Sequence, residues 1–280
     1  MDNSCISYSE PTRLYAFQKK VSDANNLDDV TLHNHNTYEI FTFLDGDIKF
    51  FIEGSAYKLN PYDMLIIRNN EMHQTIHLSK KTYKRIVITV SPSFFEATNC
   101  KYYQKIFTEH RLGECNLIKA EYVKESGLFD AIERFEKYLE AENPYEDASA
   151  RAALVEILYL ISKSDFENST EDMPNDIVKK IIDYLNENLA EIKSLDEIAE
   201  KFFISKCHLC RIFKTRTGIT VNRYITNKRI MYVKKLCKKG KSISDASFEA
   251  GFGSYSNFYK IYIKETGLSP RDGLKYEVGN

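Results

Sequence analysis

The chain has 280 residues, enough for two modest domains with separate cores, and its 39 Lys and Arg nearly balance 40 Asp and Glu. We find no apolar run of about 18 residues and no secretion signal at the start, so we expect a cytoplasmic protein without a membrane partner. Six cysteines at irregular spacing do not indicate a disulfide framework.

The near-zero net charge conceals two halves of opposite sign. Residues 1–173 hold 19 basic and 28 acidic residues, a net of −9, whereas residues 174–280 hold 20 basic and 12 acidic residues, a net of +8. Such asymmetry is typical of a basic nucleic-acid-binding part joined to an acidic part with another task. Ordinary variation in surface charge is the alternative.

Short runs of β-branched and aromatic residues fill the chain up to about Val90. The runs are residues 38–44, 47–52, 56–59, 64–67 and 85–90, separated by turn pairs such as Asp-Gly and Asn-Pro. Strands spaced roughly ten residues apart with these turns predict an antiparallel barrel or sandwich.

From about Ser93 the apolar spacing becomes helical. One stripe is Leu128, Ala131, Ile132, Phe135, Tyr138 and Leu139, and a second follows Pro144 with Leu154, Ile157, Leu158 and Ile161. These amphipathic helices either pack against the barrel or contact a second copy of the chain as a dimerisation element. Both possibilities stay open.

A polar, acidic segment over residues 164–175 predicts a linker. It separates a first domain, residues 1–163, from a second, residues 176–280. The second domain begins with an amphipathic helix over residues 176–189 and has helical spacing throughout. The whole chain is therefore expected to be α+β, with an N-terminal antiparallel β-barrel and following helices, then an all-α domain.

One pattern occurs twice in the second domain, at about residues 194–218 and 242–267. Each copy is a short helical segment, a break, and a longer segment that ends at Thr-Gly. Arg211 and Lys260 are 49 residues apart and occupy equivalent places. The repeat predicts two helix-turn-helix units for reading DNA. A helix over residues 220–239 would join them, so that two reading helices reach successive major grooves about 34 Å apart.

In the first copy, Ser205 is a helix cap and Leu209, Ile212 and Phe213 are expected to be buried. Arg211 is the candidate for base reading, because its planar fork can bind guanine O6 and N7 together. A solvated basic face is the alternative. The predicted DNA-contacting residues of this helix are Lys206, Cys207, Cys210, Arg211 and Lys214.

In the second copy, Gly251 is expected at a positive φ in the turn, with Phe252 and Phe258 in the core. Lys260 is predicted to contact phosphate rather than bases, since an ammonium is a point charge without a fork. The predicted DNA-contacting residues of this helix are Ser254, Tyr255, Ser256, Tyr259 and Lys260.

Cys207 and Cys210 have the Cys-x-x-Cys spacing of a redox pair or of half a zinc site. A second ligand pair does not follow at zinc-finger spacing, and the surroundings lack a thioredoxin-like βαβ pattern. We therefore interpret both as groove-facing residues that contact thymine methyl groups or sugars.

Residues 175–276 resemble the AraC/XylS family of bacterial transcription regulators. The resemblance rests on Ala250-Gly251-Phe252, on residues 257–264 and on the closing Thr-Gly-Leu-Ser-Pro at 266–270. It implies an asymmetric double-stranded DNA site, a homodimer and RNA polymerase as a partner. Lys260 and Tyr262 stand where the family usually has Arg and Phe, which predicts weaker base reading by the second helix.

His33, His35 and Glu39, followed by Gly46 and His73, resemble the pattern of cupin barrels. In metal-binding cupins three histidines and a glutamate converge from neighbouring strands, and two histidines at i and i+2 face one side. Sensor domains of AraC type commonly keep remnants of this motif without a metal. The resemblance therefore implies an effector pocket without a cofactor, formed by His33, His35, Tyr38, Glu39, Arg68 and His73, with Tyr57 as a further member.

The effector class that the resemblance implies is a hydroxyl-rich molecule such as a sugar. Two alternatives stay open for the same residues: a divalent metal bound by His33, His35, Glu39 and His73, or histidines that only cap the barrel mouth.

The leading hypothesis is a sequence-specific, ligand-responsive transcription regulator, an activator of carbohydrate or related metabolic genes, and not an enzyme. The competing class is a metal-dependent cupin enzyme with an accessory helical domain. A third class, a DNA-organising protein without a sensor, predicts little sequence preference.

Overall fold

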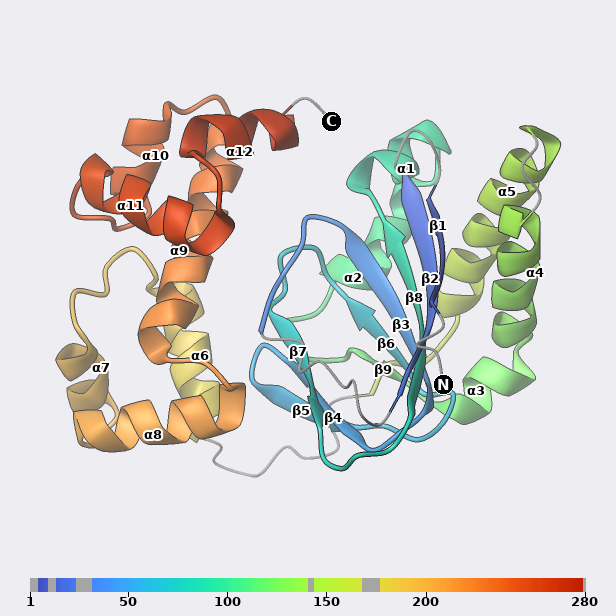
Figure 1. The fold of residues 1–280 in the computed structure, drawn as a ribbon, viewed down its shortest axis with the longest axis horizontal. Coiled ribbons are helices and arrows are strands. Elements are labelled where there is room, and N and C mark those ends of the chain that lie inside the picture. Colours follow the sequence, from blue (N-terminus) through green and yellow to red (C-terminus); the bar gives the residue numbers. More distant parts are fainter. Residues whose placement is uncertain (1–4, 10–13, 24–31, 141–143, 168–176, 279–280) are drawn as a thin grey trace. The chain divides into compact units, whose positions relative to one another are not determined.

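The computed structural model describes residues 5–9, 14–23, 32–140, 144–167 and 177–278. The chain forms two compact units, Met1–Met173 and Pro174–Asn280 (Figure 1). The first combines antiparallel strands with helices, and the described part of the second is helical, which confirms the predicted fold class. Among the described residues, none of the helices is both long and apolar enough to cross a membrane.

The strands of the first unit form two antiparallel sheets. The larger has the order β1-β2-β8-β3-β6-β9, and the smaller has the order β5-β4-β7. Their bounds are β1 Cys5–Ser9, β2 Tyr15–Ser22, β3 Tyr38–Asp45, β4 Ile48–Ile52, β5 Ser55–Lys58, β6 Met64–Ile67, β7 His73–His77, β8 Tyr83–Val90 and β9 Leu117–Ile118.

Strand β3 separates two cores because successive side chains alternate between the faces of a sheet. Tyr38 and Ile40 lie in a core shared with the helices. Phe41 and Phe43 lie in the second core, between the sheets, where Phe41 packs against Phe50 with ring centroids 4.7 Å apart. The side chain of Glu39 therefore belongs to the inner face of β3.

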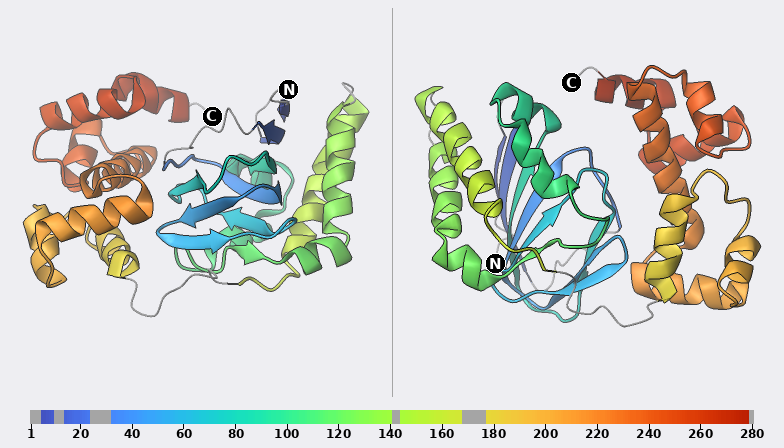
Figure 2. Two further views of the ribbon diagram at one scale, coloured as in Figure 1. Left: turned by 60° about the horizontal axis from the view of Figure 1, so that its bottom comes forward. Right: turned by 180° about the vertical axis from the view of Figure 1, so that it is seen from behind.

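The helices of the first unit cover the outer face of the larger sheet (Figure 2). Leu128, Ala131, Ile132 and Phe135 are buried in one core with β2, β3 and β8, so this stripe packs within the chain. The helices are α1 Pro92–Ala97, the 3₁₀ helix η1 Lys101–Gln104, α2 Lys105–Thr108, α3 Ala120–Glu125, α4 Leu128–Glu140 and α5 Pro144–Ile161.

The first unit continues past residue 163, where the sequence places the start of the linker. Glu167 forms a backbone bridge with Leu117, with N···O distances of 2.7 and 3.2 Å. The partner of Glu167 in this bridge is Leu117 of strand β9, whose backbone N–H and C=O groups need partners. The polar composition of the segment does not reveal this pairing. The rest of the predicted linker lies outside the described residues.

The second unit contains two helix pairs joined by one long helix. α9 Val221–Lys238 runs between the α7–α8 pair and the α10–α11 pair (Figure 1). The other bounds are α6 Ile177–Glu187, α7 Leu195–Lys201, α8 Lys206–Thr217, α10 Ile243–Glu249, α11 Tyr255–Thr266 and α12 Pro270–Val278. The predicted caps are confirmed, since Ser205 Oγ accepts from His208 N and Ser254 Oγ accepts from Asn257 N, both at 3.2 Å.

Arg229 fixes the long helix to the segment before α7. Its guanidinium donates to Leu189 O at 3.0 and 3.1 Å and to Ile192 O at 2.6 Å. Near the other copy, Arg223 Nε donates to Glu265 Oε2 at 3.2 Å. These contacts make α9 a spacer of fixed length between the two helix pairs.

The turns of the two copies adopt the same backbone conformation with different residues. Gly251 has the predicted positive φ, 86°, and a Cβ there would meet Ala190 O at 2.6 Å. Phe203 occupies the corresponding turn of the first copy with a φ of 55°, and its side chain is 95% exposed. A left-handed conformation costs a non-glycine residue roughly 1–2 kcal/mol, and exposure leaves Phe203 without packing to offset that cost.

We expect Phe203→Asn to raise the free energy of unfolding of the second unit by about 0.5–1 kcal/mol, because Asn tolerates the left-handed region better than Phe. Chemical denaturation followed by circular dichroism measures the change. Phe248→Asn is the matched control: Phe248 is also exposed, at 54%, but it lies within helix α10. The control should gain no stability, and a loss of stability in Phe203→Asn would contradict the strain argument.

Candidate nucleic-acid interface and ligand site

Helix α8 presents most of its predicted contact residues to solvent. Leu209 and Phe213 are buried, so the opposite face is available to a partner. Arg211 Nη2 donates to His208 Nδ1 at 3.1 Å, which orients the guanidinium across one turn of the helix. The predicted residues Lys206, Cys207, Arg211 and Lys214 are exposed, and Cys210 is half-buried.

Lys206 on this face is paired with α7, because its ammonium lies 2.8 Å from the carboxylate of Asp196. The hydrogen bond from Lys206 to Asp196 raises the lysine's pKa. Both groups are exposed, so a phosphate could replace the carboxylate at little cost.

Helix α11 has the same arrangement. Phe258 and Tyr262 are buried, and Phe252 packs against Phe258 with ring centroids 5.1 Å apart, as predicted for this core. Tyr255 and Tyr259 are 37% and 40% exposed, with ring centroids 6.2 Å apart. All five predicted contact residues of this helix, Ser254, Tyr255, Ser256, Tyr259 and Lys260, are exposed.

Sequence reasoning missed several residues beside these faces. His208 supports Arg211, and the i, i+3 spacing of the two could have indicated this. On α11, Asn257, Ile263 and Lys264 are also exposed. Their helical spacing from Lys260, together with the predicted burial of Phe258, could have indicated this.

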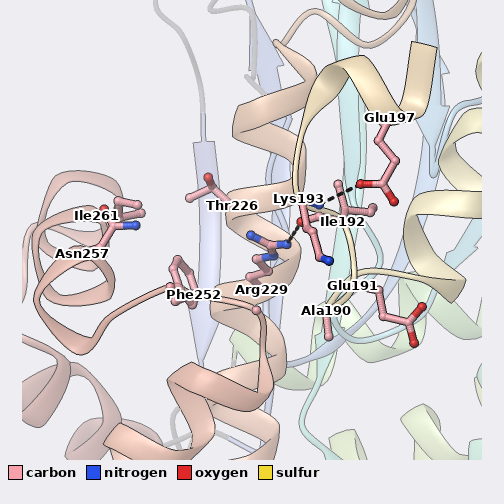
Figure 3. Close-up of a pocket in the computed structure, with 12 residues that line it drawn as sticks. Ala190, Glu191, Ile192, Lys193, Glu197, Thr226, Arg229, Phe252, Asn257 and Ile261 are labelled. Atoms are coloured by element: carbon pink, nitrogen blue, oxygen red, sulfur yellow. Dashed lines mark hydrogen bonds between the residues drawn. The ribbon is translucent and has the colours of Figure 1, made fainter. Parts of the chain in front are cut away.

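A groove of about 740 Å³ lies between the two copies (Figure 3). Arg229 lies in its wall, with Asn257 and Ile261 of α11 on one side and Lys193 and Glu197 on the other. Lys193 N donates to Glu197 Oε2 at 3.2 Å, so the carboxylate caps the start of α7. The groove is therefore lined by the residue that caps α7 in the first copy and by helix α11 of the second, within one unit.

Three imidazoles and one carboxylate meet in the first unit. Ring nitrogens of His33, His35 and His73 all lie within 4.8 Å of one another. Glu39 Oε2 lies 2.7 Å from His35 Nε2 and 3.7 Å from His73 Nε2. The predicted convergence of these four residues is therefore present in the structure.

The positions of the histidines follow from the strands. His33 and His73 exchange two backbone hydrogen bonds, at 2.9 and 3.1 Å. β7 begins at His73 and pairs with β4, whereas Glu39 lies in β3 of the larger sheet. The four side chains thus join the two sheets.

The charge state of this cluster depends on burial and on Glu39. Burial lowers the pKa of His73 to about 4, although the charge of Glu39 acts in the opposite direction. Burial also lowers the pKa of His35, but the hydrogen bond and charge of Glu39 outweigh it and leave the pKa raised. Burial raises the pKa of Glu39, yet the His35 hydrogen bond and the charges of the three histidines lower it overall.

Three other residues predicted for the effector pocket, Tyr38, Arg68 and Tyr57, lie outside this cluster of four. Tyr38 faces the helices, where its ring lies 4.5 Å from that of Phe107, because the strand alternates. Arg68 donates to the backbone carbonyls of residues 107, 108 and 110. Tyr57 is fully buried, and its hydroxyl lies 3.0 Å from both Gly113 O and Asn116 Oδ1.

Two buried glutamates that sequence reasoning missed hold the backbone next to His73. Glu53 Oε1 accepts from Met72 N at 2.7 Å, and Glu71 accepts from Gly113 N and Arg68 N at 2.6 and 2.9 Å. Burial raises the pKa of Glu71 to about 7. These contacts fix the backbone that carries His73.

The donor set of the cluster suits a divalent transition metal, since imidazole and carboxylate together are typical ligands of zinc, iron, nickel and manganese. His73 Nε2 is buried and has no hydrogen-bond partner, an observation that fits a missing ligand on that atom. His33, His35, His73 and Glu39 are the residues that would hold such an ion.

Comparison with known families assigns both units. A model described as an AraC-like ligand binding domain matches residues 22–158, and a helix-turn-helix domain matches residues 198–275. The chain belongs to the AraC/XylS family of helix-turn-helix transcription regulators with an N-terminal AraC-like ligand-binding domain.

Individual relatives extend over most of the chain. An uncharacterized HTH-type transcriptional regulator, YbfI, from Bacillus subtilis (strain 168) is 27% identical over 232 residues, 80% of each chain. The HTH-type transcriptional activator RhaS from Escherichia coli O81 is 21% identical over 245 residues, 86% of each chain. The solved structure of ToxT from Vibrio cholerae is 17% identical with a TM-score of 0.36, covering 93% of this chain and 98% of that one.

The family has direct consequences for function. The protein is a DNA-binding transcription regulator, and DNA binding belongs to the helix-turn-helix unit. Binding of a small-molecule effector belongs to the AraC-like domain. The cupin enzyme predicted as an alternative is excluded, because the family is one of regulators rather than enzymes.

Proposed function

We propose that the protein is a ligand-responsive activator that binds a specific, asymmetric DNA site through α8 and α11. The observation that carries this proposal is the pair of capped helices with exposed polar faces, held at a fixed spacing by α9. A spacer of fixed length suits two successive major grooves on one side of DNA.

In this proposal, α8 reads the base sequence and α11 mainly binds the phosphate backbone. Arg211 reads bases, because its guanidinium is exposed, oriented by His208 and able to form two parallel hydrogen bonds. Lys206, Cys207, Cys210 and Lys214 complete that contact. On α11, Lys260 binds phosphate, and Tyr255 and Tyr259 lie beside it with Ser254 and Ser256.

The effector site in this proposal is the cluster of His33, His35, Glu39 and His73. These polar groups converge beside the apolar core between the two sheets, and a few polar groups at an apolar surface are the usual character of a ligand site. RhaS, a relative at 21% identity, is named as an activator, which supports the proposed sign of regulation. Control of carbohydrate or related metabolic genes, with a sugar as effector, is the finer part of the proposal.

Further parts of the proposal concern partners. The protein would act in the cytoplasm as a homodimer and recruit RNA polymerase to promoters. Two protomers double the DNA contact and bring two ligand domains under common control. Analytical ultracentrifugation with and without operator DNA tests the dimer.

Mapping of binding sites across the genome tests the proposal as a whole. Recurrent sites with a common sequence upstream of a few operons are expected. Even coverage without a preferred sequence would instead favour a DNA-organising protein. The genes beside the sites also indicate the effector, which can then be tested for its influence on affinity.

Arg211→Ala should weaken binding to the specific site by about 1–3 kcal/mol and relax the preference at one base pair. The reason is the loss of two parallel hydrogen bonds to guanine. Fluorescence anisotropy with the specific site and with single-base variants measures both effects.

Arg271→Ala controls for the loss of one positive charge, because Arg271 is exposed on α12 of the same unit. It should leave the base preference unchanged. Equal losses on specific and random DNA for Arg211→Ala would contradict its role in base reading.

Lys260→Ala should weaken binding to all sequences alike and flatten the salt dependence of log Kd by about one unit, since one phosphate contact is lost. Titrations at several salt concentrations give the slope. Lys80→Ala, an exposed lysine of the first unit, is the control and should keep the original slope. An unchanged slope in Lys260→Ala would show that this lysine does not touch phosphate.

A further inference from the structure

Two free thiols lie on the proposed reading face of α8. Cys207 is exposed and Cys210 is half-buried. The helix begins at Lys206, so both cysteines belong to its first two turns. Side chains three residues apart lie on the same side of a helix, with Cβ atoms about 5–6 Å apart. The two thiols are therefore neighbours on the surface that is proposed to enter the major groove.

The backbone spacing of this pair suits a disulfide. In a regular helix, Cα atoms three residues apart are about 5 Å from each other, within the roughly 4.4–6.8 Å that disulfides span. The Cβ atoms of a disulfide, by contrast, are only about 3.5–4.5 Å apart. A bond between Cys207 and Cys210 therefore forms only if the first turn of α8 leaves its regular geometry. Helix ends depart from regular geometry more readily than helix interiors do.

Positive charges surround the two thiols. Lys206, Arg211 and Lys214 are exposed on the same helix, and Lys206 directly precedes Cys207. The hydrogen bond and charge of Asp196 raise the pKa of Lys206, and the charges of the two thiols add to this effect. The ammonium and both sulfur atoms therefore lie within electrostatic reach of one another. Exposed cysteines beside lysine and arginine at a helix N-terminus are typical sites of oxidation.

Other positions of the second unit differ from this pair. Cys237 of α9 is half-buried, and burial raises the pKa of its thiol, which makes it a poorer nucleophile. In the second copy, the positions 49 residues after Cys207 and Cys210 hold Ser256 and Tyr259. Helix α11 therefore has no corresponding pair of thiols, and oxidation would act on one of the two reading helices.

We propose that Cys207 and Cys210 are a modification site, at which hydrogen peroxide or another hydroperoxide converts the two thiols to a disulfide and thereby stops base reading by α8. This redox switch rests on the proposed function, in which α8 reads DNA. The described part of the second unit is entirely helical, without the βαβ surroundings of a disulfide-exchange enzyme. The pair is therefore a site that oxidants modify, not a catalytic centre.

The oxidation balances with one molecule of hydrogen peroxide. One cysteine, as its thiolate, attacks a peroxide oxygen, the O–O bond breaks, and a sulfenic acid forms while hydroxide leaves. The second thiolate attacks that sulfur, an S–S bond forms, and the S–O bond breaks with loss of a second hydroxide. The two thiol protons convert both hydroxides to water, and the two electrons that the sulfur atoms lose reduce the peroxide. A strained, exposed disulfide is readily reduced by thiols, so the modification is reversible.

The disulfide would disturb the contacts that orient Arg211. His208 lies between the two cysteines in the sequence, its backbone N–H donates to Ser205 Oγ at 3.2 Å, and its Nδ1 accepts from Arg211 Nη2 at 3.1 Å. A distorted first turn moves His208 and, with it, the guanidinium of Arg211. Helix α11 keeps its phosphate contacts. Affinity for the specific site therefore falls more than affinity for random DNA.

Peptide mapping of the full-length protein tests the disulfide. The protein is treated with hydrogen peroxide, remaining thiols are alkylated, and trypsin cuts after Lys206 and Arg211, so that one peptide, residues 207–211, carries both cysteines. We expect this peptide to escape alkylation and to be lighter by two hydrogen atoms than its reduced form. Two alkylated thiols in this peptide, or bridges to another cysteine or another chain, would overturn the site.

Fluorescence anisotropy on the same samples measures the effect on DNA binding. Oxidation should weaken binding to the specific site about tenfold or more, the scale of one lost base contact, with a smaller loss on random DNA. A thiol reductant should restore both affinities. Equal losses on the two DNAs, or an unchanged affinity after the disulfide has formed, would overturn the switch.

The double variant Cys207→Ser/Cys210→Ser should lose the response to peroxide when it is compared with its own untreated sample. Cys237→Ser is the matched control, since it removes a thiol of the same unit from outside the reading face, and it should keep the response. Circular dichroism checks that both variants are folded. A response that persists in the double variant would assign the oxidation to other residues and contradict the proposal.

Binding by the reduced protein separates the two levels of the proposal. A reduced protein with no preferred DNA sequence would overturn the proposed function and the switch together. A reduced protein that binds its specific site with an affinity that peroxide leaves unchanged would overturn the switch alone.

Discussion

Burial of the Glu39 carboxylate is the constraint on which the arrangement of the first unit depends. The alternation of β3 sends Tyr38 and Ile40 to the helices and places Glu39 on the inner face beside apolar rings. A buried carboxylate is costly unless charge or hydrogen bonds compensate it. Here the compensating groups are imidazoles from outside the strand, so the barrel has to hold those side chains in place.

That requirement joins the two sheets at one point. β3 belongs to the larger sheet and β7 to the smaller, and the cluster is the place where polar side chains of both meet. Glu53 and Glu71 fix the backbone next to His73 from the other side. A ligand that binds these side chains would therefore contact residues of both sheets. Such a ligand changes the balance of conformations only by binding one of them more tightly.

Local rules predicted much of the structure, and long-range contacts account for the rest. The caps at Ser205 and Ser254 and the positive φ of Gly251 depend on a few neighbouring residues, so the sequence reveals them. The resemblance of His33, His35, Glu39 and His73 to the cupin pattern likewise implied that these residues converge. The place of Arg68 could not be predicted, because its partners are carbonyls about 40 residues away, which no local pattern encodes.

The two helix-turn-helix copies differ in ways that follow from single residues. The first has Phe203 in a turn where the second has Gly251, and Arg211 where the second has Lys260. In the second copy a Cβ at Gly251 would collide with the carbonyl of Ala190, so the glycine is required by packing rather than by the turn alone. The first turn has no such neighbour requirement and tolerates strain. The second copy, with its tightly packed turn, is therefore suited to anchoring the protein on DNA. The first copy, in which His208 orients Arg211, is suited to selecting the DNA sequence.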